Sequence, residues 1–168
     1  MDKSGDPDAQ SWRSLGRFLY RTDAGQIDAR MWRRGALPLV VLAVLSTLAL
    51  VYIFPYTEHD LRQSPLFSAT ALGANLYVIL YSFLLILIGI CYYNLSAKRW
   101  RDLGRPPALA GLLPFSALLA GASHWLAARG GAIVPYAVPL AADLCFILVV
   151  IWNVVELAGL VHLRERRN

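Results

Sequence analysis

Charged residues, cysteines and histidines are scarce in this chain. Only 16% of its 168 residues are Asp, Glu, Lys or Arg, and it has two cysteines and three histidines. Cys91 and Cys145 fall in apolar runs at different expected depths, so we expect no disulfide. The histidines are scattered, and no Gly-rich phosphate loop, H-E-x-x-H or nucleophilic-serine motif is present. The sequence therefore predicts no enzymatic activity, no metal site and no cofactor.

Long apolar runs dominate the chain instead. Hydrophobic residues make up 57% of it, and they gather in four nearly uncharged blocks: Leu37–Phe54, Ala71–Tyr93, Ala108–Ala128 and Ile133–Leu163. Each is close to, or longer than, the roughly 20 residues that a helix needs to cross a bilayer. The helices of a soluble bundle would each show a polar face, which the first two blocks lack. We therefore predict an all-α membrane protein with four transmembrane helices in an antiparallel bundle.

Basic residues are distributed unevenly around these blocks. When the connecting segments are assigned alternately to the two sides, 14 of the 16 Lys and Arg residues fall on one side, and only Arg62 and Arg129 fall on the other. Basic segments stay in the cytoplasm, so both termini are predicted there, in a bacterial inner membrane. Topology thus accounts for the net charge of +5. We expect contacts with the lipid bilayer, including anionic lipids, rather than with nucleic acid.

The chain divides into three predicted parts: a cytoplasmic segment (1–35), the transmembrane domain (36–163) and a cytoplasmic basic tail (164–168). In the first part, apolar residues recur at helical spacing and arginines occupy another face. This pattern predicts an amphipathic helix lying in the membrane interface; the alternative is a short helix packed on the protein itself. The residues that carry the pattern are Trp12, Arg13, Leu15, Arg17 and Phe18.

Ionisable residues within the spans are candidates for function, because a bilayer makes them costly. Asp143 and Glu156 lie on the fourth span, about 20 Å apart along its axis, which is too far to share a proton. His124 on the third span is expected at the depth of Asp143, and we predict an outer polar pair. Glu156 is expected to contact one or more of four arginines: Arg30, Arg99, Arg101 and Arg105. We interpret both groups as clasps between helices, the alternative being a proton or substrate path.

The third span is rich in small residues. Ala117 and Gly121 form a small-x-x-x-small pair, which allows another helix to approach closely. We therefore predict a non-enzymatic interaction or accessory subunit of a membrane complex, with a membrane-protein partner or a second copy. One alternative is a small transporter or proton-coupled carrier that uses Asp143, His124 and Glu156. Another is an anionic-lipid headgroup binder that uses the segment 94–107.

The segment Asn94–Pro107, NLSAKRWRDLGRPP, is the only strongly basic stretch between two apolar runs. We expect a loop in which Asp102 is the counter-charge of four cations and in which unpaired arginines face phosphate headgroups. Four of its residues, followed by a leucine-rich helix with a proline, resemble the signature of the bacterial domain-of-unknown-function 805 membrane proteins: Arg99, Asp102, Gly104 and Arg105. Trp100 and Arg101 stand where that family usually has leucine and histidine.

Two shorter stretches are similar to the same family. GQIDARMW at 25–32 contains Arg30, and WNVVEL at 152–157 contains Glu156. The resemblance extends over about residues 12–160. It implies a small multi-span inner-membrane protein and supplies no activity, so it bears on fold and location.

Overall fold

The structure, a computed structural model, describes residues 7–57, 68–130 and 135–159, and this part is all-helical, as predicted. The predicted tail, 164–168, lies outside the described residues. Four helices in the described part are long and apolar enough to cross a membrane, which confirms the four predicted spans. The elements in chain order are α1 (Pro7–Arg21), α2 (Ala29–Ile53), the 3-10 helix η1 (Phe54–Thr57), α3 (Ala69–Asp102), the 3-10 helix η2 (Pro107–Gly111), α4 (Leu112–Gly130) and α5 (Ala137–Leu157).

The first two spans begin at side-chain caps. The Asp28 carboxylate accepts a hydrogen bond of 2.8 Å from the amide of Met31, and the Ser68 hydroxyl accepts one of 3.3 Å from the amide of Ala71. Both caps satisfy amides that a first helical turn leaves without a partner. Because Asp28 starts α2, the helix begins eight residues before the apolar run at Leu37, and the basic turn that precedes the run is helical.

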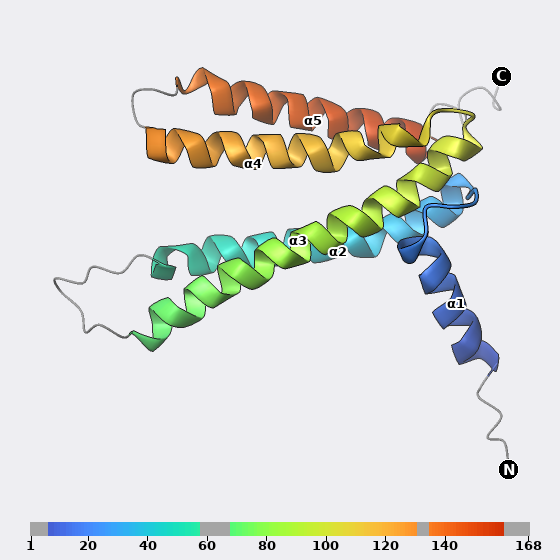
Figure 1. Cartoon of the computed structure of the whole chain (residues 1–168), viewed down its shortest axis with the longest axis horizontal. Helices are drawn as coiled ribbons and strands as arrows, with labels where there is room; N and C mark the ends of the chain where they lie inside the picture. The colour runs from blue at the N-terminus through green and yellow to red at the C-terminus, as the bar shows by residue number, and fades with distance from the viewer. Residues whose placement is uncertain (1–6, 58–67, 131–134, 160–168) are drawn as a thin grey trace, which may run out of the picture.

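The spans form two antiparallel hairpins, α2–α3 and α4–α5 (Figure 1). The hairpins meet where α3 ends, at η2 and the end of α5, and they diverge toward the opposite end. The prediction of antiparallel spans is confirmed, and the close packing between the two hairpins is confined to one end. Lipid tails are as good a partner for an apolar helix face as another apolar face, so this separation carries little energetic penalty.

The basic segment Asn94–Pro107 is not the expected loop. Its first nine residues continue α3, whose 34 residues make it about 51 Å long, well beyond the thickness of the hydrocarbon layer. The helix ends in a Schellman motif, in which Arg105 N donates to Trp100 O (2.9 Å) and Gly104 N donates to Arg101 O (3.0 Å). Gly104 has a φ of 68°, a conformation that suits glycine. Pro106 and the η2 turn follow, so the reversal occupies only a few residues.

The α4–α5 contact runs along a face of α4 whose small residues are spaced i, i+4, i+7. Ser116, Ala120 and Ser123 are each 7% exposed. Both hydroxyls donate to backbone oxygens of their own helix, Leu113 O at 2.9 Å and Ala120 O at 2.7 Å, so neither is left without a partner. Small side chains here let the two backbones approach closely. This face is adjacent to the predicted pair, Ala117 and Gly121, which is exposed.

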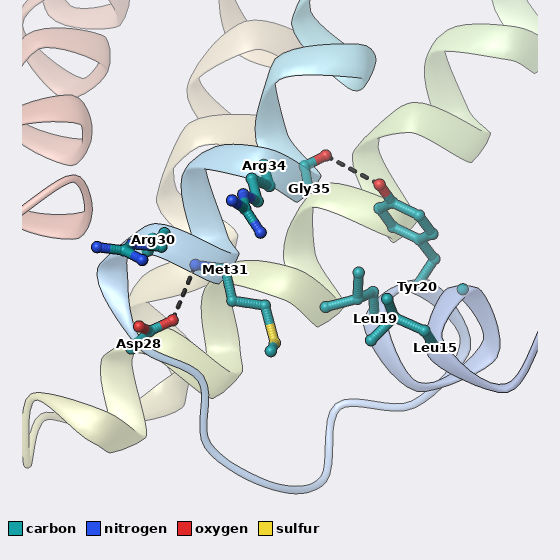
Figure 2. A pocket seen from close by; sticks show the side chains of 9 residues that line it. Leu15, Leu19, Tyr20, Asp28, Arg30, Met31, Arg34 and Gly35 are labelled. Carbon is teal, nitrogen blue, oxygen red and sulfur yellow. Dashed lines mark hydrogen bonds between the residues drawn. The ribbon is translucent and has the colours of Figure 1, made fainter. Parts of the chain in front are cut away.

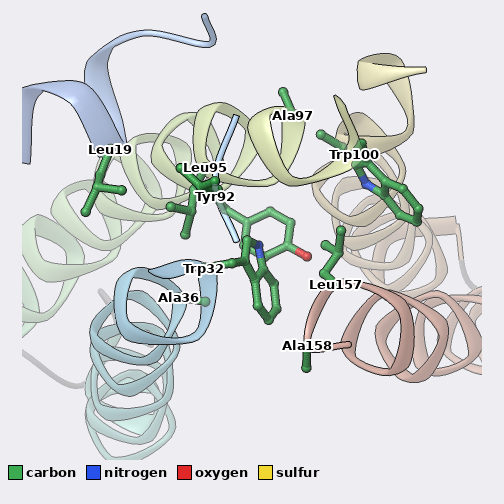
Figure 3. Close-up of a cluster of buried hydrophobic side chains, with 11 residues drawn as sticks. Leu19, Trp32, Ala36, Tyr92, Leu95, Ala97, Trp100, Leu157 and Ala158 are labelled. Carbon is green, nitrogen blue, oxygen red and sulfur yellow. The ribbon is translucent and has the colours of Figure 1, made fainter. Parts of the chain in front are cut away.

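The buried core lies where the hairpins meet (Figure 3). The largest fully buried side chains there are Trp100, Lys98, Leu95, Leu157 and Asn153. Along the rest of the spans large apolar side chains are exposed, as expected of helices that face lipid. The core is therefore small and sits beside the basic end of α3. We call this region the basic junction: residues 94–105 with the end of α1, the start of α2 and the end of α5.

Candidate functional site

The basic junction gathers most of the polar residues that the sequence singled out. Residues 95–100 of α3 are all buried, including Lys98 and Arg99. Different faces of this helix end contact α1, α2 and α5.

One face of α3 holds the end of α1. Asn94, Lys98 and Arg101 follow the i, i+4, i+7 spacing that places side chains on one side of a helix. The Lys98 ammonium is completely buried and donates to the carbonyl oxygens of Phe18, Leu19 (3.2 Å) and Thr22 (2.5 Å). The last carbonyls of a helix lack intrahelical partners and carry partial negative charge, so a cation stabilises them. The Lys98 ammonium also lies 4.6 Å from the centre of the Phe18 ring.

Two further bonds extend this cap. Asn94 Nδ2 donates to Tyr20 O at 2.8 Å. The Arg101 guanidinium donates to Asp23 O and pairs with the Asp23 carboxylate at 2.9 Å. Because both partners of that ion pair are partly exposed, it contributes less than the buried Lys98. The end of α1 is thus fastened to α3 by side chains on consecutive turns.

A second face of α3 caps α5. Arg99 Nε donates to Leu157 O at 3.1 Å, and the same guanidinium pairs with Asp102 one turn further on. Asp102 is therefore a counter-charge, as predicted, and its partner is Arg99. The chain turns at Gly159, which has a φ of 72°. A Cβ there would lie 3.2 Å from Ala29 Cβ, so the end of α5 also contacts the start of α2.

The predicted contact of Glu156 with an arginine is confirmed. Arg105 Nη1 lies 3.2 Å from Glu156 Oε1, with the Arg105 side chain 45% exposed and the Glu156 side chain 20% exposed. The same guanidinium lies 5.6 Å from the centre of the Trp100 ring, and Trp100 stacks on Trp152 at 5.0 Å between centroids. Trp100 Nε1 is buried and has no hydrogen-bond partner in the described part of the chain. This stack joins α3 to α5.

A third face of α3 contacts α2. Trp32 Nε1 donates to Ser96 Oγ at 3.1 Å, and the Trp32 ring meets Tyr92 edge-on. The Tyr92 hydroxyl in turn donates to Asn153 Oδ1 on α5 at 3.3 Å, so α2, α3 and α5 share one polar network. Gly35 makes the approach of α2 possible, since a Cβ there would lie 3.0 Å from Leu95.

Some predictions about this segment are wrong. Arg99 and Arg101 were expected to face headgroups if they did not bind Glu156, but both bond to backbone oxygens of the protein instead. Arg30 was a candidate partner of Glu156, and it makes no ion pair with that carboxylate. It lies near the start of α2 and is one of the residues that line a groove described below.

Sequence reasoning did not single out Asn94 or Ser96 as functional residues, and it named Lys98 only as one of the four cations around Asp102. The signal that could have identified them is the run of polar residues at helical spacing directly after the second apolar block. A helix that continues past the membrane would place those side chains on faces where other elements end.

The predicted outer pair is confirmed at the far end of the α4–α5 hairpin. His124 Nε2 lies 2.9 and 3.1 Å from the two carboxylate oxygens of Asp143. The His124 and Asp143 side chains are 58% and 41% exposed. Neither residue belongs to the basic junction, so the two polar groups lie at opposite ends of the spans.

The amphipathic helix is present as α1, which leaves the hairpins at a steep angle (Figure 1). Arg17 is exposed, Phe18 is 37% exposed, and Leu15 packs against the core. The side chains of Trp12 and Arg13 lie outside the described part. The end of α1 packs on the protein, as the alternative interpretation held, while its direction across the spans is the one that an interfacial helix requires.

A groove of about 600 Å³ lies between α1 and the start of α2 (Figure 2). Leu15 and Leu19 line it from α1, and Met31 and Arg34 line it from α2. Tyr20 closes one side by donating to Gly35 O at 3.0 Å. Burial, with a smaller contribution from Cys91, raises the pKa of the Tyr20 hydroxyl above its ordinary value.

Among the described residues no group of His, Cys, Asp and Glu could hold a metal ion, and both cysteines are free. In comparisons with protein-family models, curated proteins and solved structures, the chain matches none. The resemblance to the domain-of-unknown-function 805 proteins therefore stays a prediction that rests on its own residues.

Proposed function

We propose that this multi-pass membrane protein is a non-enzymatic accessory subunit of a membrane complex, in a bacterial inner membrane with both termini in the cytoplasm. The observation that carries the proposal is an unused helix contact face on α4. Ala117 and Gly121 are exposed, and a Cβ built on Gly121 meets nothing within 4 Å. A face of this kind suits the close approach of a partner helix.

The contact face on α4 is separate from the internal one. The chain packs α4 on α5 through Ser116, Ala120 and Ser123, so Ala117 and Gly121 are not needed for the hairpin. Small residues in a span give up apolar contacts with lipid, and another helix can restore those contacts. The partner is either a different membrane protein or a second copy of this chain.

The state of the intramembrane carboxylates argues against the carrier. Asp143 is paired with His124 and Glu156 with Arg105, and neither carboxylate lines the groove between α1 and α2. A carrier needs ionisable groups that line a shared path across the membrane, and these two pairs lie at opposite ends of the spans. Headgroup binding by 94–107 is also disfavoured, because Lys98, Arg99, Arg101 and Arg105 all have partners among the described residues.

The orientation rests on the basic residues. The end of α1, the start of α2, the end of α3 and the end of α5 lie together at one end of the molecule (Figure 1). This end holds three arginines of the first turns of α2 as well as the basic segment of α3. Such a concentration of positive charge supports a cytoplasmic location for this end.

The test compares the assembly state of two glycine variants. Gly121→Leu fills the proposed contact face, and inserting a large side chain into a tight contact costs about 1–3 kcal/mol. The matched control is Gly73→Leu on α3, because a Cβ at Gly73 also meets nothing within 4 Å. Each tagged chain is extracted from its native membrane with polymer into lipid discs, and the mass of the particle is measured.

We expect the unmodified chain in particles that contain protein beyond one copy of 18.6 kDa. Gly121→Leu should lower the assembled fraction about tenfold, whereas Gly73→Leu should leave it unchanged and both variants should unfold at the same temperature. Recovery of the unmodified chain as single copies, or equal assembly of the two variants, would refute the proposal.

A further inference from the structure

The groove between α1 and α2 combines an apolar wall with unpaired positive charge. Leu15, Leu19 and Met31 supply apolar surface, and Arg30 and Arg34 lie along the α2 side (Figure 2). Both arginines are exposed, and neither side chain makes an ion pair or a hydrogen bond with a described residue. We propose that this groove binds one anionic phospholipid, with its phosphate at Arg34 and Arg30 and part of an acyl chain against Leu15 and Met31.

The depth of the groove favours a lipid as the occupant. Arg30 and Arg34 stand one to two turns before Leu37, where the apolar run of α2 begins. That is the level at which basic residues flank a span and meet phosphates. The helix α1 leaves the hairpins at a steep angle (Figure 1). With the spans crossing the bilayer, a groove between α1 and the start of α2 is expected to open along the membrane surface.

The charge of the groove is favourable for a phosphate. Among the described residues that line it, Asp28 is the one acidic residue, and one of its oxygens already accepts the amide of Met31 at 2.8 Å. Two guanidinium groups against one carboxylate leave a net positive rim. Arg guanidinium groups also present the forked donors that match phosphate oxygens.

Gly16 gives a way to close the groove without disturbing the protein. It lines the groove, and a Cβ built there meets nothing within 4 Å. Gly16→Leu should therefore fill the space that an acyl chain needs, and leucine is the better helix former. Gly73→Leu again serves as the control, because that glycine is equally open and lies on α3.

The experiment counts lipids that remain bound. The full chain is purified in mild detergent with equal amounts of phosphatidylglycerol and phosphatidylcholine, and retained lipid is measured by native mass spectrometry. We expect the unmodified chain to retain phosphatidylglycerol about fivefold over phosphatidylcholine. Arg34→Gln should lower that retention about fivefold, the factor expected per basic residue at an anionic surface. Gly16→Leu should lower it at least as much.

Arg33→Gln is the matched charge control, since Arg33 is exposed and in the same turn but does not line the groove. It should change retention less than twofold. Equal losses in Arg33→Gln and Arg34→Gln would overturn the proposal, because net charge alone would then explain binding. Equal retention of the two lipids, unchanged binding in Gly16→Leu, or displacement of the lipid by millimolar glycerol phosphate would also overturn it.

Discussion

Replacing Lys98 by methionine should release α1 while leaving the two hairpins intact. Methionine keeps the length and volume of the side chain but removes the donors to Phe18 O, Leu19 O and Thr22 O. Hydrogen bonds of charged groups contribute about 1.5–3 kcal/mol each, and the helix end adds about 0.3–1 kcal/mol. The cost of burying the Lys98 ammonium offsets part of this stabilisation. When α1 detaches, its freed carbonyl oxygens form hydrogen bonds with water, which offsets a further part. We therefore expect a net loss of about 3 kcal/mol, a factor of roughly 10² in the opening equilibrium.

Hydrogen exchange across residues 7–21, measured by mass spectrometry in lipid discs, reports this opening. Exchange there should accelerate about 100-fold in Lys98→Met, with no change in the spans. Arg101→Met is the matched control, because Arg101 contacts the same segment through an ion pair that is partly exposed and contributes about 0.2–1 kcal/mol. Equal acceleration in the two variants, or unfolding of the hairpins in Lys98→Met, would refute the reasoning.

Three further predictions concern other contacts. Replacing either His124 or Asp143 by alanine should lower the free energy of unfolding by about 1 kcal/mol. The double variant should lose less than the sum of the two single losses, and additive losses would show that the pair is not coupled. Trp100→Phe should destabilise the protein about 1 kcal/mol less than Trp32→Phe in denaturant titrations, because only the Trp32 indole donates a hydrogen bond; equal losses would contradict this. A reporter fused after Asn168 should be active only in its cytoplasmic form, and periplasmic activity would reverse the proposed orientation.

The spans and the two carboxylate pairs could be predicted because each follows from a strong local constraint. A run of twenty apolar residues has few alternatives to a membrane helix. A carboxylate near the membrane surface needs a counter-charge, which narrowed the partners of Glu156 to nearby arginines. The prediction that His124 pairs with Asp143 rested only on the similar depth expected for the two residues in the membrane. In each case the prediction required only distance along a helix and the cost of an unpaired charge.

The helical structure of the basic segment could not be predicted from such local constraints, because it depends on tertiary contacts. Basic residues after an apolar run are common at membrane surfaces, so their composition predicts a solvated loop and headgroup contacts. The segment is helical instead because Lys98 and Arg99 find helix ends to cap. Those ends belong to α1 and α5, which lie about 80 and 58 residues away in the sequence. No local sequence pattern indicates that the ends of α1 and α5 lie beside Lys98 and Arg99.

The location of these caps has a consequence for the whole molecule. In lipid, apolar contacts between helices gain little over contacts with acyl chains, so polar bonds decide where helices stay together. Here buried bonds from Lys98 and Arg99 and the Trp32–Ser96 bond tie α1, α2 and α5 to one end of α3. The opposite ends of the hairpins have no comparable bond between them among the described residues, and they diverge. A protein fixed at one end and open along its spans leaves helix faces such as that of Gly121 exposed, and the proposed role as an accessory subunit requires such a face for its partner.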